Sequence, residues 1–373
     1  MPLRALRLQL LNLRNHLLAS PRFRRAASAF WPTQRIARAR ARDVFDLVAG
    51  FTYSQTLFAC IELGLLALLR RGPRTIRALS DALSLDEDAT RALAEAATAL
   101  RLLQSTGDDE YGLGVLGAAV VDDQAVQNMV THHAHFYRDM ADPIGLLKAR
   151  RHDTELAAYW PYAEGNDVAM DEEAVARYTA LMSSSQPMIY EQVHAAFRIN
   201  NHHHLLDVGG GNGAFVVSAA QIAPSLKLSL FDMPPVAKLA EQHLAAEGLS
   251  SRVTVHGGDF TRDALPEGAD LISLVRILHD HDDDVVQALL ANVYRALPAR
   301  GRVLIAEPLA ATAGAPRMGS VYFTFYLRAM GSGRPRRFDE LAGRLKAAGF
   351  IAVHQEKTPI PMLASVIHAV KPG

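Results

Sequence analysis

The stretch LLDVGGGNG, residues 205–213, decides the fold of this chain. Its apolar first half predicts a short strand, its glycines predict a tight turn, and residues 214–220 continue with the pattern of a helix. A strand, a glycine-rich turn and a helix in this order open an α/β sheet that binds a nucleotide-like ligand. Glycine suits this turn because it lets the chain bend sharply and brings the backbone close to a ligand.

Two kinds of ligand fit the turn. Gly209, Gly211 and Ala214 match the G-x-G-x-x-A form of a dinucleotide fingerprint, which predicts an NAD-dependent oxidoreductase. Asp207 ends the strand, and the glycines at 209, 211 and 213 then resemble the DxGxGxG turn of class I methyltransferases. The turn alone leaves both ligands open, so the decision rests on residues further along the chain.

After the turn the chain alternates strands and helices, which predicts a doubly wound parallel sheet of the Rossmann-like kind. The carboxyl ends of parallel strands meet at one edge of such a sheet, and ligands bind there. The strands predicted after the first are 226–231, 252–256, 270–277 and 301–306, with closing strands at 350–355 and 362–370.

Acidic residues follow the second and third of these strands. Asp232 lies about 20 residues after the glycine turn, where a carboxylate accepts both ribose hydroxyls of a nucleoside. The alternative for Asp232 is a helix cap before Pro234. Asp259 would accept a hydrogen bond from an adenine amino group, with Phe260 against the ring, or would belong to an ordinary turn. The combination of turn and acids favours the ligand-binding interpretation.

The fourth strand ends in the titratable run RILHDHDDD, residues 276–284. His279 falls where a substrate would lie over the cofactor, and imidazole takes up a proton near neutral pH. Glu307 follows the fifth strand and would orient and polarise that imidazole. The acids at 282–284 are also oxygen ligands for a divalent metal. A helix cap at Asp282 or Asp283 is favoured over metal, and no metal site is predicted.

The region before the sheet has the layout of a winged helix. Helices are expected at 75–83 and 86–103, and residues 106–112 look like a hairpin tip. Such a module binds DNA or mediates dimerisation. Helix 86–103 carries four acids against two arginines, which would repel phosphate, so dimerisation is favoured.

Residues 1–42 form a basic arm with ten arginines and no acid, while the rest of the chain holds 39 acids against 29 basic residues. Leucines at 3, 6, 10, 13 and 17 recur at helical spacing, as in an amphipathic helix on an anionic membrane surface. A solvated arm, an arm packed on a dimer partner, and a transit peptide are the alternatives. Without an unbroken run of 18 apolar residues, no segment is expected to span a bilayer.

The expected domains are the arm (1–42), a helical winged-helix domain for dimerisation and substrate (43–190), and a catalytic domain (191–373). The single cysteine, Cys60, excludes an internal disulfide and favours a reducing compartment. Together with the arm, this leads us to expect a cytoplasmic protein that contacts a membrane peripherally through residues 1–42.

From about Asp43 to its end, the chain resembles the S-adenosylmethionine-dependent O-methyltransferases of the caffeate and acetylserotonin type. The motifs that carry the resemblance are residues 206–213, 258–260 and 276–280. It implies S-adenosylmethionine as cofactor, a homodimer and no nucleic-acid partner. It also implies that His279 accepts the proton, that Glu307 steadies His279, and that Met182 lies beside the substrate. The cofactor site would be lined by Asp207, Gly209, Gly211, Asp232, Asp259, Phe260 and Arg276.

Within that family the arm, residues 276–283 and the loop 331–336 look like the bacterial hydroxyneurosporene (demethylspheroidene) O-methyltransferases. This implies methylation of the tertiary 1-hydroxyl of an acyclic carotenoid, in photosynthetic bacteria. Two residues depart from the family pattern: His281 replaces the usual tryptophan, and Pro335 stands where many plant members have a second glutamate. We therefore expect a different support for the base, and a phenolic or quinone-type acceptor is the alternative substrate.

Overall fold

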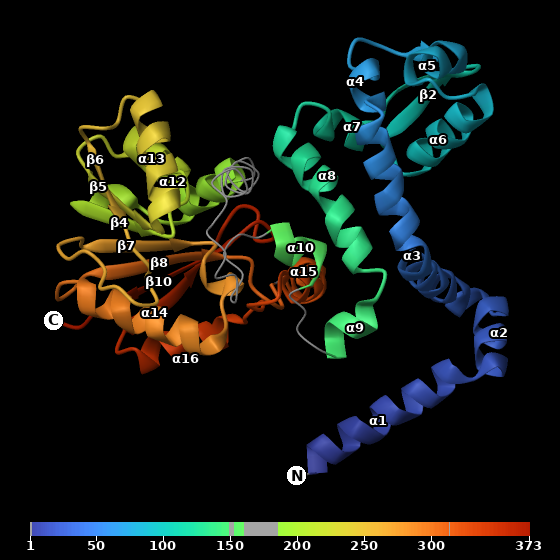
Figure 1. Ribbon diagram of the computed structural model, residues 1–373. Helices are drawn as coiled ribbons and strands as arrows, with labels where there is room; N and C mark the ends of the chain where they lie inside the picture. Colours follow the sequence, from blue (N-terminus) through green and yellow to red (C-terminus); the bar gives the residue numbers. More distant parts are fainter. Residues whose placement is uncertain (1, 149–152, 160–185, 313) are drawn as a thin grey trace. The chain divides into compact units, whose positions relative to one another are not determined.

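A computed structural model describes residues 2–148, 153–159, 186–312 and 314–373 (Figure 1). The chain divides into two compact units, Met1–Asp122 and Asp123–Gly373. This division does not test the predicted borders at residues 42 and 190, which remain predictions.

The first unit begins with three consecutive helices, α1 (Pro2–Ala19), α2 (Pro21–Ala29) and α3 (Trp31–Glu62). Ser20 separates α1 from α2 because its side chain caps α2, accepting a hydrogen bond from Phe23 N at 3.4 Å. The leucine spacing of the arm therefore forms a helix, as the sequence predicts.

Helix α3 presents an apolar surface to solvent. Within the described residues it is the one helix that is long and apolar enough to cross a membrane, judged by length and composition alone. The sequence pattern did not single out α3, because polar residues interrupt its apolar stretch and leave no unbroken run of 18 apolar residues. The exposed apolar residues of its central part are Val44, Phe45, Leu47, Val48 and Phe51.

The winged helix is present in the first unit. The helices are α4 (Leu65–Leu69), α5 (Ile76–Leu83), α6 (Glu87–Ala99) and α7 (Val115–Val120), and the strands are β1 (Arg74–Thr75), β2 (Leu103–Gly107) and β3 (Glu110–Leu113). The strands pair antiparallel in the order β1-β3-β2. Helix α6 ends four residues before the predicted end, because Leu103 is buried as the first residue of β2.

In the second unit, seven described strands form one sheet in the order β6-β5-β4-β7-β8-β10-β9. All neighbouring pairs are parallel except those of β10, which runs antiparallel to both β8 and β9. The strands are β4 (His204–Val208), β5 (Lys227–Asp232), β6 (Val253–Gly257), β7 (Leu271–Val275), β8 (Arg302–Glu307), β9 (Ile351–Glu356) and β10 (Ser365–Val370).

Helices cover both faces of this sheet, so its central strands are almost continuously apolar. Helices α12 (Ala214–Ile222) and α13 (Pro234–Ala246) pack on one face, and α14 (Asp283–Ala296) and α16 (Phe338–Ala347) pack on the other (Figure 1). The predicted fold class is therefore confirmed: a doubly wound α/β sheet preceded by a helical winged-helix unit.

The other described helices of this unit lie outside the two sheet layers. They include α8 (Gln124–Asp139), α9 (Pro143–Lys148), α10 (Glu155–Tyr159), the short turns Ile199–Asn201 and η2 (Leu278–Asp280), the π-helix η3 (Met318–Tyr322) and α15 (Phe323–Met330). Residues 186–196 are also helical and pack into the core on the α12 face of the sheet. The sequence predicts one helix over 317–330, but the first part is π-helical. Single π-turns of this kind occur often at functional sites.

Candidate active site

The glycine turn after β4 adopts a backbone conformation that other residues rarely reach. Gly209 has φ +70° and Gly211 has φ +59°. A Cβ on Gly209 would lie 2.4 Å from Cδ1 of Ile277, so the turn touches the chain just after β7. A Cβ on Gly211 would meet no described atom within 4 Å, so conformation, rather than crowding, requires glycine there.

Two carboxylates, the buried Asp207 and the half-buried Asp232, support this turn. Asp207 accepts a hydrogen bond from Ser273 Oγ at 2.6 Å, and burial together with the charge of Asp232 raises the pKa of Asp207 to about 7. Asp232 accepts from Gly211 N at 2.8 Å and from Met233 N at 2.7 Å. Because Met233 holds the cap position of α13, the alternative of Asp232 as a helix cap is wrong.

Burial raises the pKa of Asp232 to about 6, against the two backbone N–H groups that favour its ionised form. Asp232 thus ties the end of β5 to the glycine turn at the edge where the parallel strands end. Each carboxylate oxygen has a second lone pair, so these bonds leave acceptors for a ligand hydroxyl.

Asp259 and Phe260 follow β6 at the same edge. The Asp259 Oδ1 atom accepts from both N (2.8 Å) and Oγ1 (2.6 Å) of Thr261, so the alternative of an ordinary turn describes these contacts. Phe260 is half-buried and meets the ring of His281 edge to face, with centroids 5.2 Å apart.

Arg276 has φ +58°, an uncommon conformation for a residue with a side chain. Its backbone N donates to the carbonyl of Ala306 at 2.8 Å, which holds the end of β7 against β8. Met182, predicted to lie beside the substrate, is outside the described residues.

His279 is buried in the η2 turn, between two carboxylates. Its Nδ1 is hydrogen-bonded to Oε2 of Glu307, and its Nε2 lies 3.1 Å from Oδ1 of Asp280. The other oxygen of Glu307 accepts from Ile277 N at 3.0 Å and from Leu278 N at 2.7 Å. One carboxylate thus fixes both the ring and the backbone that precedes it.

Burial opposes protonation of His279, but the carboxylates of Asp280 and Glu307 outweigh it and the nearby charge of Arg276, so the pKa of His279 is raised. Asp280 was not among the predicted site residues. Neighbours along a strand point to opposite faces, whereas the 3₁₀ turn brings these adjacent side chains together. In the sequence, only the position of Asp280 directly after His279 could have indicated that it belongs to the site.

An aromatic cluster lies beside His279. Phe323 meets the His279 ring edge to face at 5.6 Å, and the rings of Tyr322 and Tyr326 stack at 5.5 Å. From α8, the Nε2 atom of His133 lies 2.8 Å from the hydroxyl of Tyr322, and His132 is similarly bonded to Tyr326 at 3.1 Å. No sequence pattern predicted these contacts, because they join segments about 190 residues apart.

The histidines of α8 are ordinary packed side chains. Burial lowers the pKa values of His132 and His133 to about 4, which keeps both neutral. Across the described ranges no three His, Cys, Asp or Glu side chains are grouped so as to hold a metal ion.

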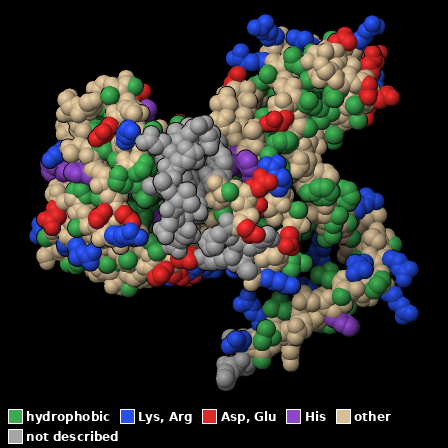
Figure 2. All heavy atoms as spheres, viewed as in Figure 1, with side chains coloured by type: hydrophobic (Ala, Val, Ile, Leu, Met, Phe, Trp, Pro, Cys, Tyr) green, Lys and Arg blue, Asp and Glu red, His purple; other side chains and the backbone are tan. Residues whose placement is uncertain are grey.

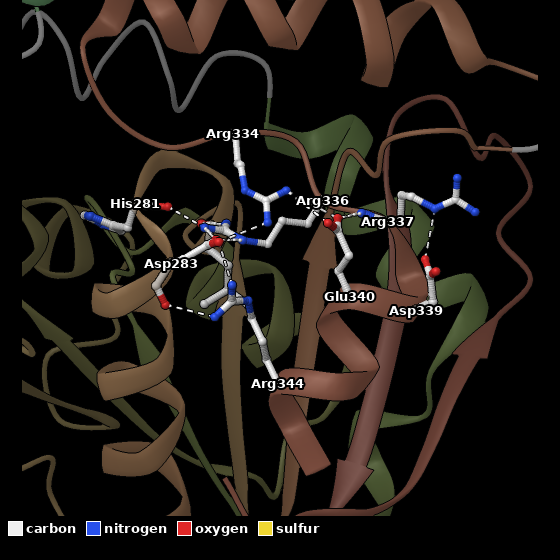
Figure 3. Close-up of polar contacts among 9 residues, drawn as sticks. His281, Asp283, Arg334, Arg336, Arg337, Asp339, Glu340 and Arg344 are labelled. Carbon is white, nitrogen blue, oxygen red and sulfur yellow. Dashed lines mark hydrogen bonds and ion pairs between the residues drawn. The ribbon is translucent and has the colours of Figure 1, made fainter. Parts of the chain in front are cut away.

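The acids that follow the His279 turn bind neighbouring protein groups. Asp282 holds the cap position of α14, but its Oδ1 accepts from Gly333 N instead of from the helix, and Asp283 pairs with arginines (Figure 3).

Comparison with known proteins identifies the two parts of the chain. Residues 137–351 match the O-methyltransferase domain, and residues 45–121 match the O-methyltransferase dimerisation domain. The chain belongs to the S-adenosylmethionine-dependent O-methyltransferases. For the glycine turn the NAD alternative is therefore wrong, and the winged helix belongs to a dimerisation domain, which supports a homodimer.

Several relatives of this O-methyltransferase are known. The chain is 41% identical to demethylspheroidene O-methyltransferase of Cereibacter sphaeroides, over 96% of this chain and 94% of the relative. It is 38% identical to the enzyme of that name from Rhodobacter capsulatus, over 90% and 83%. The structure of human N-acetylserotonin methyltransferase in complex with S-adenosylmethionine matches with a TM-score of 0.75 and 26% identity, over 90% and 98%.

S-adenosylmethionine is the cofactor of this O-methyltransferase. The described residues fit it: the turn is open beside Gly211, and carboxylates follow two neighbouring strands at the same edge. Most of the apolar stretch of α3 falls within the dimerisation domain, which relates it to a partner subunit more directly than to lipid.

Proposed function

We propose that this O-methyltransferase methylates the tertiary 1-hydroxyl of an acyclic carotenoid of the hydroxyneurosporene (demethylspheroidene) type, with His279 as the general base. The observation that carries the proposal is the buried His279–Glu307 pair bordered by the ring of Phe323. The near full-length similarity to two demethylspheroidene O-methyltransferases supports the choice of acceptor. The reaction would be a step of carotenoid biosynthesis.

The chemistry follows from the position of the imidazole. When bound, S-adenosylmethionine supplies a methyl group that a nucleophilic oxygen can attack. Glu307 accepts from Nδ1–H of His279, which leaves the lone pair of Nε2 to take the hydroxyl proton. The acceptor hydroxyl would bind at Nε2, beside Asp280. A general base of this kind contributes about 10²–10⁴-fold to the rate.

A tertiary alcohol is a weaker acid than a phenol, so its proton must leave as the new C–O bond forms. The raised pKa of His279 suits this task, because a stronger base takes a proton from a weak acid more readily. Phe323, Phe136 and Tyr326 provide a buried aromatic surface near the base, which fits an apolar acceptor. A phenolic or quinone-type acceptor is the second candidate, since aromatic rings also stack on such a surface.

The remaining site assignments belong to this proposal. Met182 would lie beside the substrate. His279 would accept the proton, and Glu307 would orient the His279 ring. The S-adenosylmethionine site would be lined by Asp207, Gly209, Gly211, Asp232, Asp259, Phe260 and Arg276.

Incubation with labelled S-adenosylmethionine tests the acceptor. The purified protein would be given a membrane extract containing hydroxylated carotenoids and, in parallel, a set of phenols and quinols. We expect a labelled carotenoid ether, identified by its mass. Label on a phenol or quinol alone would refute the carotenoid assignment and leave the family unchanged.

The basic arm gives this enzyme a route to a substrate dissolved in a membrane. The exposed apolar side chains of α1 are Leu6, Leu8, Leu10, Leu13 and Leu17. Figure 2 shows apolar side chains and Lys or Arg side chains next to one another along the first helices. Leucines that enter the acyl boundary and arginines that meet lipid phosphates fit an anionic membrane surface.

The family models do not account for the arm, since both begin after residue 44. The alignment with the Cereibacter enzyme spans 357 of the 373 residues, so it reaches into the arm. A segment shared with a carotenoid-methylating relative and lying outside the dimerisation domain supports contact with the membrane that holds the substrate.

Deleting residues 1–42 is expected to abolish sedimentation with vesicles of anionic phospholipid. The full chain should bind such vesicles, bind neutral vesicles much less, and lose binding as salt rises, because ten arginines provide the attraction. Activity toward a detergent-dispersed acceptor is the control and should persist after the deletion. Equal vesicle binding by both proteins would refute a membrane role for the arm.

A further inference from the structure

A loop far along the chain holds the backbone of the turn that carries His279. This loop, residues 331–336, is named here the arginine loop. Arg334 N donates to the carbonyl of His279 at 2.9 Å, and Ser332 Oγ donates to the carbonyl of Asp280 at 2.7 Å. The contact joins segments more than 50 residues apart in sequence.

Gly333 brings the two backbones into direct contact. It has φ +75°, and a Cβ there would lie 2.1 Å from the carbonyl oxygen of His279. Gly333 N donates to Oδ1 of Asp282 at 2.9 Å, immediately after the turn. The arginine loop thus fits the His279 turn closely enough to exclude a side chain at this position.

Arg336 bonds to the carbonyls on either side of those of His279 and Asp280 (Figure 3). Its Nη1 donates to the carbonyl of Leu278 at 2.6 Å, and its Nη2 donates to the carbonyl of His281 at 2.7 Å. With the bonds of Arg334 and Ser332, each of the four consecutive carbonyls from Leu278 to His281 accepts a bond from the arginine loop.

Asp283 holds the guanidinium of Arg336 in place. The Oδ1 atom of Asp283 accepts from Nε and Nη2 of Arg336 at 3.0 and 2.8 Å, and its Oδ2 pairs with Arg334 and Arg344 at 3.1 and 2.6 Å (Figure 3). The side chain of Arg336 is 2% exposed. A buried guanidinium held on one side by a carboxylate has a fixed orientation, so the direction of its other N–H groups is also fixed.

The same residue reaches the strand end that carries Glu307. The carbonyl of Arg336 accepts from Ala310 N at 2.8 Å, three residues after Glu307. Arg336 therefore connects the backbone on both sides of the His279–Glu307 pair. This support comes from the segment that contains Pro335, for which the sequence predicted a different support of the base.

We propose that Arg336 is a positioning residue for the reaction, whose guanidinium holds the carbonyls of Leu278 and His281 and thereby sets the imidazole of His279 against Glu307. The inference rests on the proposed role of His279 as the base. Arg336 touches neither the imidazole nor the reacting atoms. Its effect is on the place and angle of the ring, to which reaction rates are sensitive at the scale of about 1 Å.

The variant R336K tests geometry separately from charge. Lysine keeps the positive charge near Glu307, but a single ammonium group cannot reach Asp283 and both carbonyls at once. We expect kcat to fall about 10-fold to 100-fold, with the affinity for S-adenosylhomocysteine unchanged. The groups that set the pKa of His279 are Asp280, Glu307 and Arg276, and a ring displaced from Glu307 should titrate at lower pH.

The matched control is R337K. Arg337 is the next residue, its side chain is 62% exposed, and it pairs with the exposed Asp339. This variant should leave kcat, the pH profile and Tm unchanged. S332A is the milder companion of R336K, because it removes a single bond to the Asp280 carbonyl, and it should shift the titration of His279 in the same direction by less.

NMR titration of the His279 imidazole in the full chain is the deciding measurement, because it does not depend on which acceptor is used. A lower pKa of His279 in R336K, in a protein that binds S-adenosylhomocysteine normally, supports the proposal. An unchanged titration in R336K, with or without lost activity, overturns it. If His279→Ala kept full activity, the base assignment would fail, while a shift of the titration in R336K would still establish the positioning contact.

Discussion

Replacement of His279 by alanine is expected to lower kcat by about 10²–10⁴-fold, the contribution of a well-placed general base. The side chain is buried, Nδ1 is held by Glu307, and no other imidazole of the described chain is paired with that carboxylate. Without the ring, the acceptor proton must leave to water, which a buried aromatic surface excludes. The glycine turn and Asp232 are not contacted by His279, so cofactor binding should persist.

The measurement pairs initial rates at saturating S-adenosylmethionine with calorimetric titration of S-adenosylhomocysteine. His204→Gln is the control, because His204 begins β4 at the opposite end of the strand from the glycine turn and bonds to Ser229. That variant should retain its rate. Full activity of the His279→Ala protein with normal S-adenosylhomocysteine binding would rule out His279 as the base.

Changing Glu307 to glutamine should lower kcat by roughly 10²-fold or more, within the limit set by the base itself. If the amide oxygen keeps the two backbone N–H groups of Ile277 and Leu278, the amide NH₂ faces Nδ1 of His279. The ring must then carry its proton on Nε2, and that nitrogen has no lone pair for the acceptor hydroxyl. This is the error of tautomer that disables a Ser-His-Asp triad when its carboxylate becomes an amide.

The Glu307 variant should also change the dependence of kcat on pH, in a direction that follows from the pKa of His279. The pKa of His279 is raised partly by Glu307, and a protonated ring cannot accept a proton, so activity falls as pH drops through that raised value. Removing the charge of Glu307 lowers the pKa of His279, and the acid limb of kcat should move to lower pH. Glu356→Gln is the control, because Glu356 bonds to His368 at 2.9 Å between β9 and β10. An acid limb at the same pH in the Glu307 variant would contradict the pairing.

The arrangement of the sheet made much of this site readable from the sequence. Asp207, Asp232, His279 and Glu307 each lie at or after the end of a separate strand, and parallel strands bring their carboxyl ends to one edge. The glycine turn marks the first strand of the sheet. The later strands then follow in chain order, and the residue at the end of each can be read from the sequence. The contact of His279 with Glu307 follows from that rule.

What the sequence did not reveal depends on contacts between distant segments. The bonds of Arg336 to the His279 turn join residues with no shared periodicity, and the edge contact of Phe323 with His279 comes from the helix after a π-turn. Asp259 illustrates a local limit: the sequence allows both a turn and an adenine site there and favours the adenine site, whereas the contacts with Thr261 are those of a turn. The apolar surface of α3 was not singled out, because polar residues interrupt its apolar stretch.

The arginine loop recognises the His279 turn through its carbonyl oxygens, and every amino acid has a carbonyl oxygen. The side chains at positions such as 280 and 281 can therefore change while the turn keeps its shape. The position of the base and the identity of the residues around it then become separable traits. Under the proposed mechanism, a change of the side chain at position 281 can alter the surroundings of the base without rebuilding the part that removes the proton.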